Sequence, residues 1–251
     1  MSNSSLVKFT KISPNKTSPR THAIDRITPH CVVGQCSIET LGNLFAASSR
    51  QASSNYGIGV DGRVGMYVEE KDRSWCSSSG ANNHRAVTIE CASDTTSPYA
   101  MKDAVYSSLA TLCTDICKRN GKTKLIWFGD KTKTLAYTPK SNEMIVTVHR
   151  WFANKACPGD WLYSRLDELA AEVTSRLGGT STTATSTQTT TSYTVRVTAT
   201  VLNIRKGPGT SYAVTGQIKD KGVYTIVQES NGWGKLKSGA GWISLAYTKK
   251  V

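Results

Sequence analysis

Apolar and polar residues alternate with two different spacings through the first 177 residues. Three apolar stretches have the length and composition of strands: Thr21–Val33, Arg85–Cys91 and Met144–Val148. Two segments between them have apolar residues at helical spacing: a short helix capped by Ser37 and running to about Arg50, and a longer one from Ser97-Pro98 to Asn120-Gly121. Strands that alternate with helices predict a layered α/β domain.

Two further elements complete this region. Ser53–Glu69 has two apolar arms around Asp61-Gly62, which predicts a β-hairpin with a type I′ turn. After Pro158, apolar residues recur at helical spacing as far as Gly178: Leu162, Leu166, Leu169, Val173 and Leu177. Pro158 suits the first turn of that helix, because its missing N–H would have no partner there.

A change of composition at Gly178 divides the chain. Of the 15 residues in Gly178–Ser192, 11 are Ser or Thr and none is charged or large and apolar, so the segment cannot bury enough surface to fold. Residues 193–251 have short apolar stretches separated by turns, without helical periodicity. We therefore expect a domain over 1–177, a linker over 178–192 and a small all-β barrel over 193–251.

The chain carries a formal net charge of +13, from 31 basic and 18 acidic side chains. Residues 193–251 hold 9 basic and 2 acidic side chains, a net +7, and the rest of the chain holds 22 and 16, a net +6. This excess predicts a polyanionic partner: nucleic acid, an acidic membrane surface or a cell wall that bears teichoic acid. The sequence has no recognisable nucleic-acid-binding motif, which favours anionic wall polymers over nucleic acid.

The first ten residues lack the apolar core of a signal peptide, and no later apolar run approaches the length of a membrane span. The seven cysteines show no spacing typical of a disulfide framework. Cys113 and Cys117, four apart on a predicted helix, are expected to be buried core thiols. We expect synthesis in a cytosol that keeps the thiols mostly reduced, and no membrane insertion.

The segment His149–Asp160 places an imidazole, a lysine and a thiol close together before the last predicted helix. Cys157 is expected at the N-terminus of that helix, where the positive end of the dipole favours the thiolate. A thiolate and a histidine nitrogen are ligands that Zn²⁺ prefers. His30 ends the first predicted strand and is the candidate third ligand; the alternative is a histidine merely packed beside Pro29.

One charged residue interrupts the apolar pattern of the central strands. Glu90 lies late in Arg85–Cys91, and burying a carboxylate is costly unless it has a task or a partner. A catalytic role and a salt bridge to a nearby Lys or Arg both remain open.

Four motifs, in this order, resemble the zinc amidases of the peptidoglycan-recognition type: Thr28-Pro29-His30, Ser53–Gly59 with Asp61-Gly62, Thr88-Ile89-Glu90, and His149 through Cys157-Pro158-Gly159. Residues 1–177 resemble the catalytic part of phage and prophage endolysins that are N-acetylmuramoyl-L-alanine amidases. Residues 193–251 resemble a bacterial SH3-type domain, with the motifs Leu202–Arg205, Gly207-Pro208-Gly209 and Gly241-Trp242-Ile243. The resemblance implies a mixed sheet with flanking helices, followed by a small SH3-like barrel that binds the wall.

The resemblance also implies roles for individual residues. His30, His149 and Cys157 would hold one Zn²⁺ and leave a fourth position for water, which agrees with the pattern of catalytic zinc sites. Glu90 would take a proton from that water and pass it to the departing amine. Lys155 would stabilise the oxyanion that develops on the carbonyl oxygen.

The sequence departs from the family at one position. Some relatives have a tyrosine in the region of Ser54-Asn55, whereas Tyr56 comes one or two positions late. More of the proton transfer is therefore expected to fall on Glu90.

The implied reaction is hydrolysis of the amide bond between N-acetylmuramic acid and L-alanine of bacterial peptidoglycan. The implied setting is an endolysin made in the host cytoplasm that reaches the wall on lysis. One alternative is a cysteine peptidase with Cys91 as nucleophile and His149 as base, which leaves His30 and Cys157 without a role. Another is a wall-binding protein that has lost catalysis, which the presence of all three candidate ligands opposes.

Overall fold

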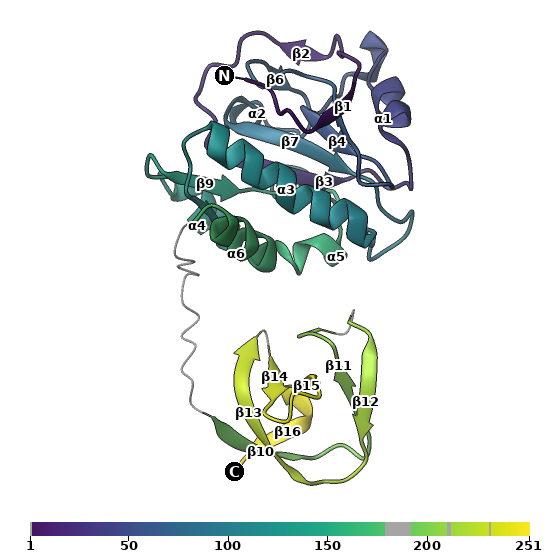
Figure 1. The fold of residues 1–251 in the computed structure, drawn as a ribbon, viewed down its shortest axis with the longest axis vertical. Coiled ribbons are helices and arrows are strands. Elements are labelled where there is room, and N and C mark those ends of the chain that lie inside the picture. The colour runs from purple at the N-terminus through teal and green to yellow at the C-terminus, as the bar shows by residue number, and fades with distance from the viewer. Residues whose placement is uncertain (1, 179–191, 210–211, 231) are drawn as a thin grey trace. The chain divides into compact units, whose positions relative to one another are not determined.

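The computed structural model describes residues 2–178, 192–209, 212–230 and 232–251. The chain divides into two units, Met1–Thr183 and Ala184–Val251, each with its own hydrophobic core (Figure 1). Apart from Gly178 and Ser192, the predicted linker lies outside the described residues. Every helix in the described ranges is too short or too polar to cross a membrane.

The first unit is built, within residues 2–178, on a mixed sheet of seven strands. In spatial order these are β1 (Val7–Thr10), β5 (Val64–Met66), β4 (Tyr56–Ile58), β7 (Ala86–Cys91), β3 (Arg26–Cys31), β9 (Glu143–Val146) and β8 (Lys124–Ile126). Neighbouring strands are parallel, apart from β4 and β5, which form the predicted hairpin. A separate ribbon pairs β2 (Lys16–Thr17) with β6 (Arg73–Ser74).

Helices and 3₁₀ turns connect these strands. They are α1 (Ile38–Leu44), η1 (Ser48–Arg50), α2 (Gly80–Arg85), α3 (Asp103–Arg119), α4 (Lys131–Ala136), η2 (His149–Trp151), α5 (Asp160–Tyr163) and α6 (Leu166–Arg176). α3 and α6 lie side by side across one face of the sheet (Figure 1). The predicted α/β class is confirmed.

Alternation along the central strand gives the sheet one apolar and one polar face. Val87, Ile89 and Cys91 of β7 are fully buried in the core that α3 and α6 cover. Thr88 and Glu90 point to the other face, because successive side chains of a strand alternate. On that face hydroxyl groups pair across strands, as Thr88 does with Ser74 at 2.7 Å. Glu90 is therefore on the polar face of the sheet, near the end of β7.

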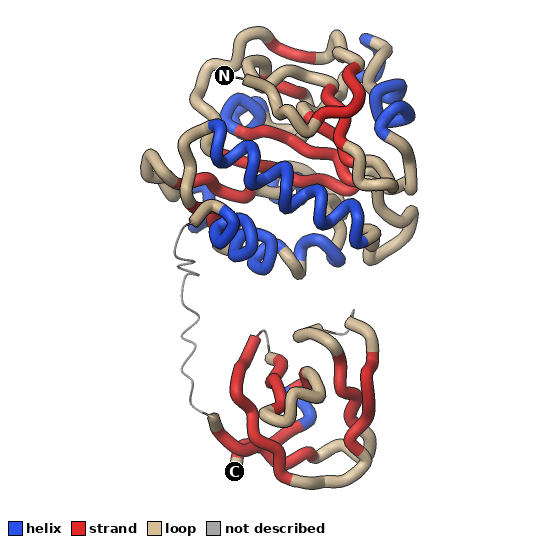
Figure 2. Tube along the Cα trace, in the orientation of Figure 1, coloured by secondary structure: helices blue, strands red, loops and turns tan. Residues whose placement is uncertain are grey.

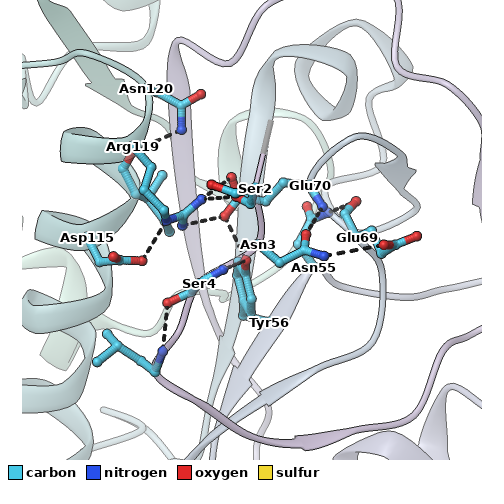
Figure 3. Close-up of polar contacts among 12 residues, drawn as sticks. Ser2, Asn3, Ser4, Asn55, Tyr56, Glu69, Glu70, Asp115, Arg119 and Asn120 are labelled. Carbon is cyan, nitrogen blue, oxygen red and sulfur yellow. Dashed lines mark hydrogen bonds and ion pairs between the residues drawn. The ribbon is translucent and has the colours of Figure 1, made fainter.

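A buried ionic network ties the N-terminal segment to β4 and α3 (Figure 3). Glu70 accepts hydrogen bonds from the Arg119 guanidinium at 2.6 and 2.9 Å and from the Tyr56 hydroxyl at 2.7 Å. The Tyr56 oxygen in turn accepts the backbone N–H of Ser4 at 2.9 Å. Burial and the nearby Glu70 charge raise the pKa of Tyr56, so its hydroxyl keeps the proton that it donates. Tyr56 therefore lies on the apolar side of the sheet, on the face opposite to Glu90.

Two predicted elements differ in detail from the structure. Ser37 does cap α1, accepting the N–H of Thr40 at 3.2 Å, but the helix ends at Leu44. Phe45 turns inward to pack against Tyr67, and a separate 3₁₀ turn follows. The hairpin loop spans residues 59–63, all described, and Gly62 alone among them has a positive φ. The predicted type I′ turn is therefore wrong, since that turn needs two positive φ angles.

The long helix begins later than predicted. α3 starts at Asp103 rather than at Ser97-Pro98, because the Pro98 carbonyl accepts the N–H of Trp161 at 3.0 Å and holds this segment beside α5. The apolar register is as predicted, and the core thiols are confirmed, with these side chains fully buried: Val105, Leu109, Leu112, Cys113, Ile116 and Cys117. Gly121, with φ +67°, follows the helix end.

The second unit consists of strands apart from one 3₁₀ turn, η3 (Leu245–Tyr247), within the described part of residues 192–251 (Figure 2). Its strands lie in the order β12 (Val214–Ile218), β11 (Leu202–Arg205), β15 (Trp242–Ser244), β14 (Trp233–Leu236), β13 (Val223–Ser230), β10 (Tyr193–Val197) and β16 (Thr248–Lys250). All neighbours are antiparallel. Buried apolar residues fill the interior: Val195, Val197, Leu202, Ile218, Ile226, Leu236 and Ile243. The predicted all-β class is confirmed.

Candidate metal centre and catalytic cleft

Two adjacent parallel strands place the first two candidate residues side by side. His30 of β3 and Glu90 of β7 are register partners, so their side chains project from the same face of the sheet. On its other edge β3 pairs with β9 only as far as Ile27, whose carbonyl accepts the N–H of Thr147. Pro29, the next residue facing that edge, has no N–H to continue the ladder. The chain after β9 thus leaves the sheet and enters η2 at His149.

His30, His149 and Cys157 converge beside the ends of these strands. The Cys157 Sγ lies 3.2 Å from the His30 Nδ1, and the two imidazole centroids are 5.0 Å apart. One potential ligand atom from each of the three residues lies within 4.8 Å of the other two. The second histidine is oriented by Ser78, whose hydroxyl lies 2.9 Å from the His149 Nε2.

The state of Cys157 differs from the sequence prediction. α5 begins at Asp160, not directly after Cys157, and has four residues, so its dipole is short and displaced. The Cys157 side chain points inward beside His30, and burial raises its thiol pKa well above the ordinary value. The predicted stabilisation of the thiolate by the helix is therefore wrong. A bound cation would have to supply that stabilisation.

The donor set fits a zinc ion. Burial lowers the pKa of His30 well below its ordinary value, and burial together with the Lys155 charge lowers that of His149. Both imidazoles are thus neutral, which is the form that binds metals. Two histidine nitrogens and one cysteine sulfur are a set that zinc accepts with a fourth position left open.

Glu90 has no lysine or arginine within 4.0 Å among the described residues, so the salt-bridge alternative is not realised. Its Oε1 lies 4.0 Å from the His30 Nδ1 and 3.6 Å from the Cys76 Sγ. Its Oε2 is buried and makes no hydrogen bond within the described part of the chain. Burial raises the pKa of Glu90 to about 7, although the Cys76 thiol and the Arg50 charge act in the opposite direction. A carboxylate with such a pKa is suited to exchanging protons at neutral pH.

Part of this cluster lines a cleft with a volume of about 430 Å³. Glu90, His149 and Lys155 line it, as do the cations Arg50 and Arg73. Three cationic side chains against one carboxylate give the cleft a charge suited to an anionic substrate. Lys155 is exposed here, in the same cavity as His149, one of the candidate metal ligands.

Cys91, the nucleophile of the cysteine-peptidase alternative, lies outside the cleft. Cys91 follows Glu90 in β7 and therefore points to the opposite, apolar face, where it is fully buried. Burial raises its pKa well above the ordinary value, so it stays a protonated core thiol. This placement is inconsistent with the cysteine-peptidase alternative.

Sequence reasoning missed two side chains of the cleft, Cys76 and Ser78. Both lie on the loop between β6 and α2, where no periodic pattern marks them. Their contacts with Glu90 and His149 arise from the tertiary fold, across 14 and 71 residues of sequence. A positive φ of 58° at Ser78 marks the sharp turn that presents its hydroxyl, and the sequence carries no glycine or asparagine there to signal it.

Comparison with known families agrees with this geometry. The N-acetylmuramoyl-L-alanine amidase family model matches residues 20–160, and the bacterial SH3 domain model matches residues 200–249. Because the first match spans more than half of the chain, the protein belongs to the N-acetylmuramoyl-L-alanine amidase family. It is a peptidoglycan amidase with a C-terminal region of the bacterial SH3 type.

Solved structures with a similar fold include endolysins and amidases. A mutant of PlyL is 11% identical, with a TM-score of 0.48 over 66% of this chain and 98% of that one. The catalytic domain of XlyA is 13% identical, with a TM-score of 0.47 over 66% and 97%. The N-acetylmuramoyl-L-alanine amidase LysC from Clostridium intestinale URNW is 15% identical, with a TM-score of 0.42 over 62% and 87%. No curated protein matches the chain.

Proposed function

We propose that the amidase is zinc-dependent, with His30, His149 and Cys157 as the metal ligands and Glu90 as the general base. The observation that carries this proposal is the convergence of the three ligand side chains beside the largely buried carboxylate of Glu90, which has no lysine or arginine within 4.0 Å in the described part of the chain. A bound zinc ion would polarise the scissile carbonyl and lower the pKa of a water molecule toward ~7.

The chain's own groups would carry the proton transfers. Glu90 would accept a proton from the attacking water and deliver it to the departing nitrogen of L-alanine, because its raised pKa allows both steps near neutral pH. Lys155 would donate to the carbonyl oxygen as negative charge develops there, since its ammonium opens into the same cleft. Ser78 would hold His149 through the Nε2 and leave the Nδ1 toward the ligand cluster.

The C-terminal unit would hold the enzyme on its substrate. Its net charge of +7 would add attraction to anionic wall polymers to the peptidoglycan binding expected of a bacterial SH3 domain. Tethering would raise the local concentration of the catalytic unit at the wall without changing its chemistry.

The proposal is tested by digesting purified cell walls and identifying the new chain ends. We expect new L-alanine amino termini, their loss in the presence of a chelator, and their return with added Zn²⁺. Cys91→Ser should digest walls like the wild type, since Cys91 lies in the core. New reducing sugar ends without alanine amino termini, or full activity in the chelator, would contradict the proposal.

Lys155→Met should lower turnover by about 10²–10³-fold, which is the usual effect of removing one donor to an oxyanion. Lys131→Met, which changes an exposed lysine at the start of α4, is the matched control and should leave turnover unchanged.

A further inference from the structure

Cys76 and Glu90 are two further side chains in the cleft of the types that bind metals. The Cys76 Sγ lies 3.6 Å from the Glu90 Oε1, and the two residues come from different elements, the loop after β6 and the strand β7. Both line the cavity that contains His149, so ions in solution have access to them. The Glu90 Oε2 is buried and makes no hydrogen bond within the described residues, so this carboxylate has unused capacity to bind a cation.

The spacing of the pair matches metal chelation. Zinc binds thiolate sulfur at ~2.3 Å and carboxylate oxygen at ~2.1 Å, so a tetrahedral angle separates the two ligand atoms by ~3.6 Å. The observed separation is 3.6 Å. Cys76 and Glu90 therefore need little movement to chelate one ion. A sulfur and an oxygen also select for thiophilic divalent cations such as Zn²⁺ or Cd²⁺ over Ca²⁺ or Mg²⁺.

His30 lies within reach of both sets of potential ligands, and this determines the order in which they bind ions. Ligand atoms of His30, Cys76 and Glu90 lie within 4.8 Å of one another, as do those of His30, His149 and Cys157. The His30 Nδ1 faces Cys157 at 3.2 Å and can bind one ion at a time. The site with His30, His149 and Cys157 keeps three protein ligands, whereas Cys76 and Glu90 are left with two. The second pair should therefore fill only after the first site.

We propose that Cys76 and Glu90 bind a second thiophilic divalent cation, and that this ion inhibits the amidase. The inhibition follows from the proposed function, because the second ion would occupy the carboxylate oxygen of the general base. At saturation, the loss of turnover should approach that caused by removing Glu90, about 10²–10⁴-fold. Metal binding by the pair does not depend on the catalytic role of Glu90.

The test is a titration of the metal-free, reduced full-length protein with Cd²⁺, monitored by thiolate-to-cadmium charge-transfer absorption. The wild type should bind two equivalents, each with a thiolate signal, the second more weakly than the first. Cys76→Ser and Glu90→Gln should keep the first signal and lose the second. Cys36→Ser, which changes another partly exposed thiol, is the matched control and should titrate like the wild type.

Amidase activity gives a second readout. Excess Zn²⁺ should inhibit the wild type and the Cys36→Ser control in the concentration range of the second binding step. The proposal is overturned if the wild type shows a single thiolate signal, or if Cys76→Ser retains both. By contrast, a first signal that persists when Cys157→Ser is added to Cys76→Ser would count against the three-ligand zinc centre, because neither proposed thiolate ligand is then present. Loss of the second signal in Cys76→Ser alone would still support the second site.

Discussion

His30 and Glu90 are register partners on the adjacent parallel strands β3 and β7, with the His30 Nδ1 4.0 Å from the Glu90 Oε1. The position of the proposed base relative to His30, the first candidate ligand, is thus fixed by the backbone hydrogen bonds of the sheet, not by a loop. Sites held by strands keep their geometry more closely than sites held by loops.

Glu90→Gln should lower turnover by about 10²–10⁴-fold while the zinc content stays at the wild-type value, because Gln keeps the shape but cannot accept the proton. Turnover is measured as alanine amino termini released from purified walls, and zinc by elemental analysis of the same samples. Glu172→Gln, on α6 with a half-exposed ion pair to Arg176, is the control and should leave both values unchanged. A Gln variant that keeps wild-type turnover would remove Glu90 from the mechanism.

Ser78→Ala should weaken zinc binding by about 10–100-fold, because the hydroxyl that orients His149 is lost. The measurement is competition for Zn²⁺ against a chelator of known affinity. At saturating zinc, turnover should return toward the wild-type value, since Ser78 is a positioning residue. An unchanged zinc affinity would show that the contact with His149 is incidental.

The buried network of Figure 3 predicts a large stability effect far from the cleft. Arg119→Met would leave the Glu70 carboxylate buried without its cation and should cost about 3–5 kcal/mol in the free energy of unfolding. Arg176→Met removes a half-exposed i,i+4 pair and should cost less than ~1 kcal/mol. Urea unfolding of both variants, followed by circular dichroism, gives the comparison. Equal losses in the two variants would contradict this description of the network.

The second unit should act as a separate wall-binding module, because it has its own apolar core. A fragment of residues 193–251 should sediment with purified walls, and the bound fraction should fall as salt is raised, since exposed charges are screened beyond ~8 Å at physiological ionic strength. The fragment of residues 1–177 is the comparison and should bind more weakly. Failure of residues 193–251 to sediment at any salt concentration would contradict a targeting role.

Particular residues show what the sequence was able to predict. His30, Glu90 and the Cys157 segment were found because strand patterns and motif order mark them, and the structure brings all three together. Cys76 and Ser78 were not found, because their partners are distant in sequence and they lie on an irregular loop.

The last predicted helix shows a second limit. It is broken into α5 and α6 at Arg165, whose guanidinium donates to the Trp161 carbonyl at 2.8 Å and lies over the Trp161 ring. Apolar spacing continues across this break, so periodicity alone predicts one helix. The same limit applies to Cys157. Its side chain is buried by residues from other parts of the fold, and no local sequence pattern predicts that burial.

The most direct test of the zinc centre is the release of alanine amino termini from purified peptidoglycan as Zn²⁺ is added stepwise to the metal-free protein. We expect no release without zinc and a linear rise up to one equivalent per chain. In His30→Ala we expect no release at one equivalent. Full activity in the metal-free protein, or the same zinc response in His30→Ala as in the wild type, would contradict the proposed zinc centre.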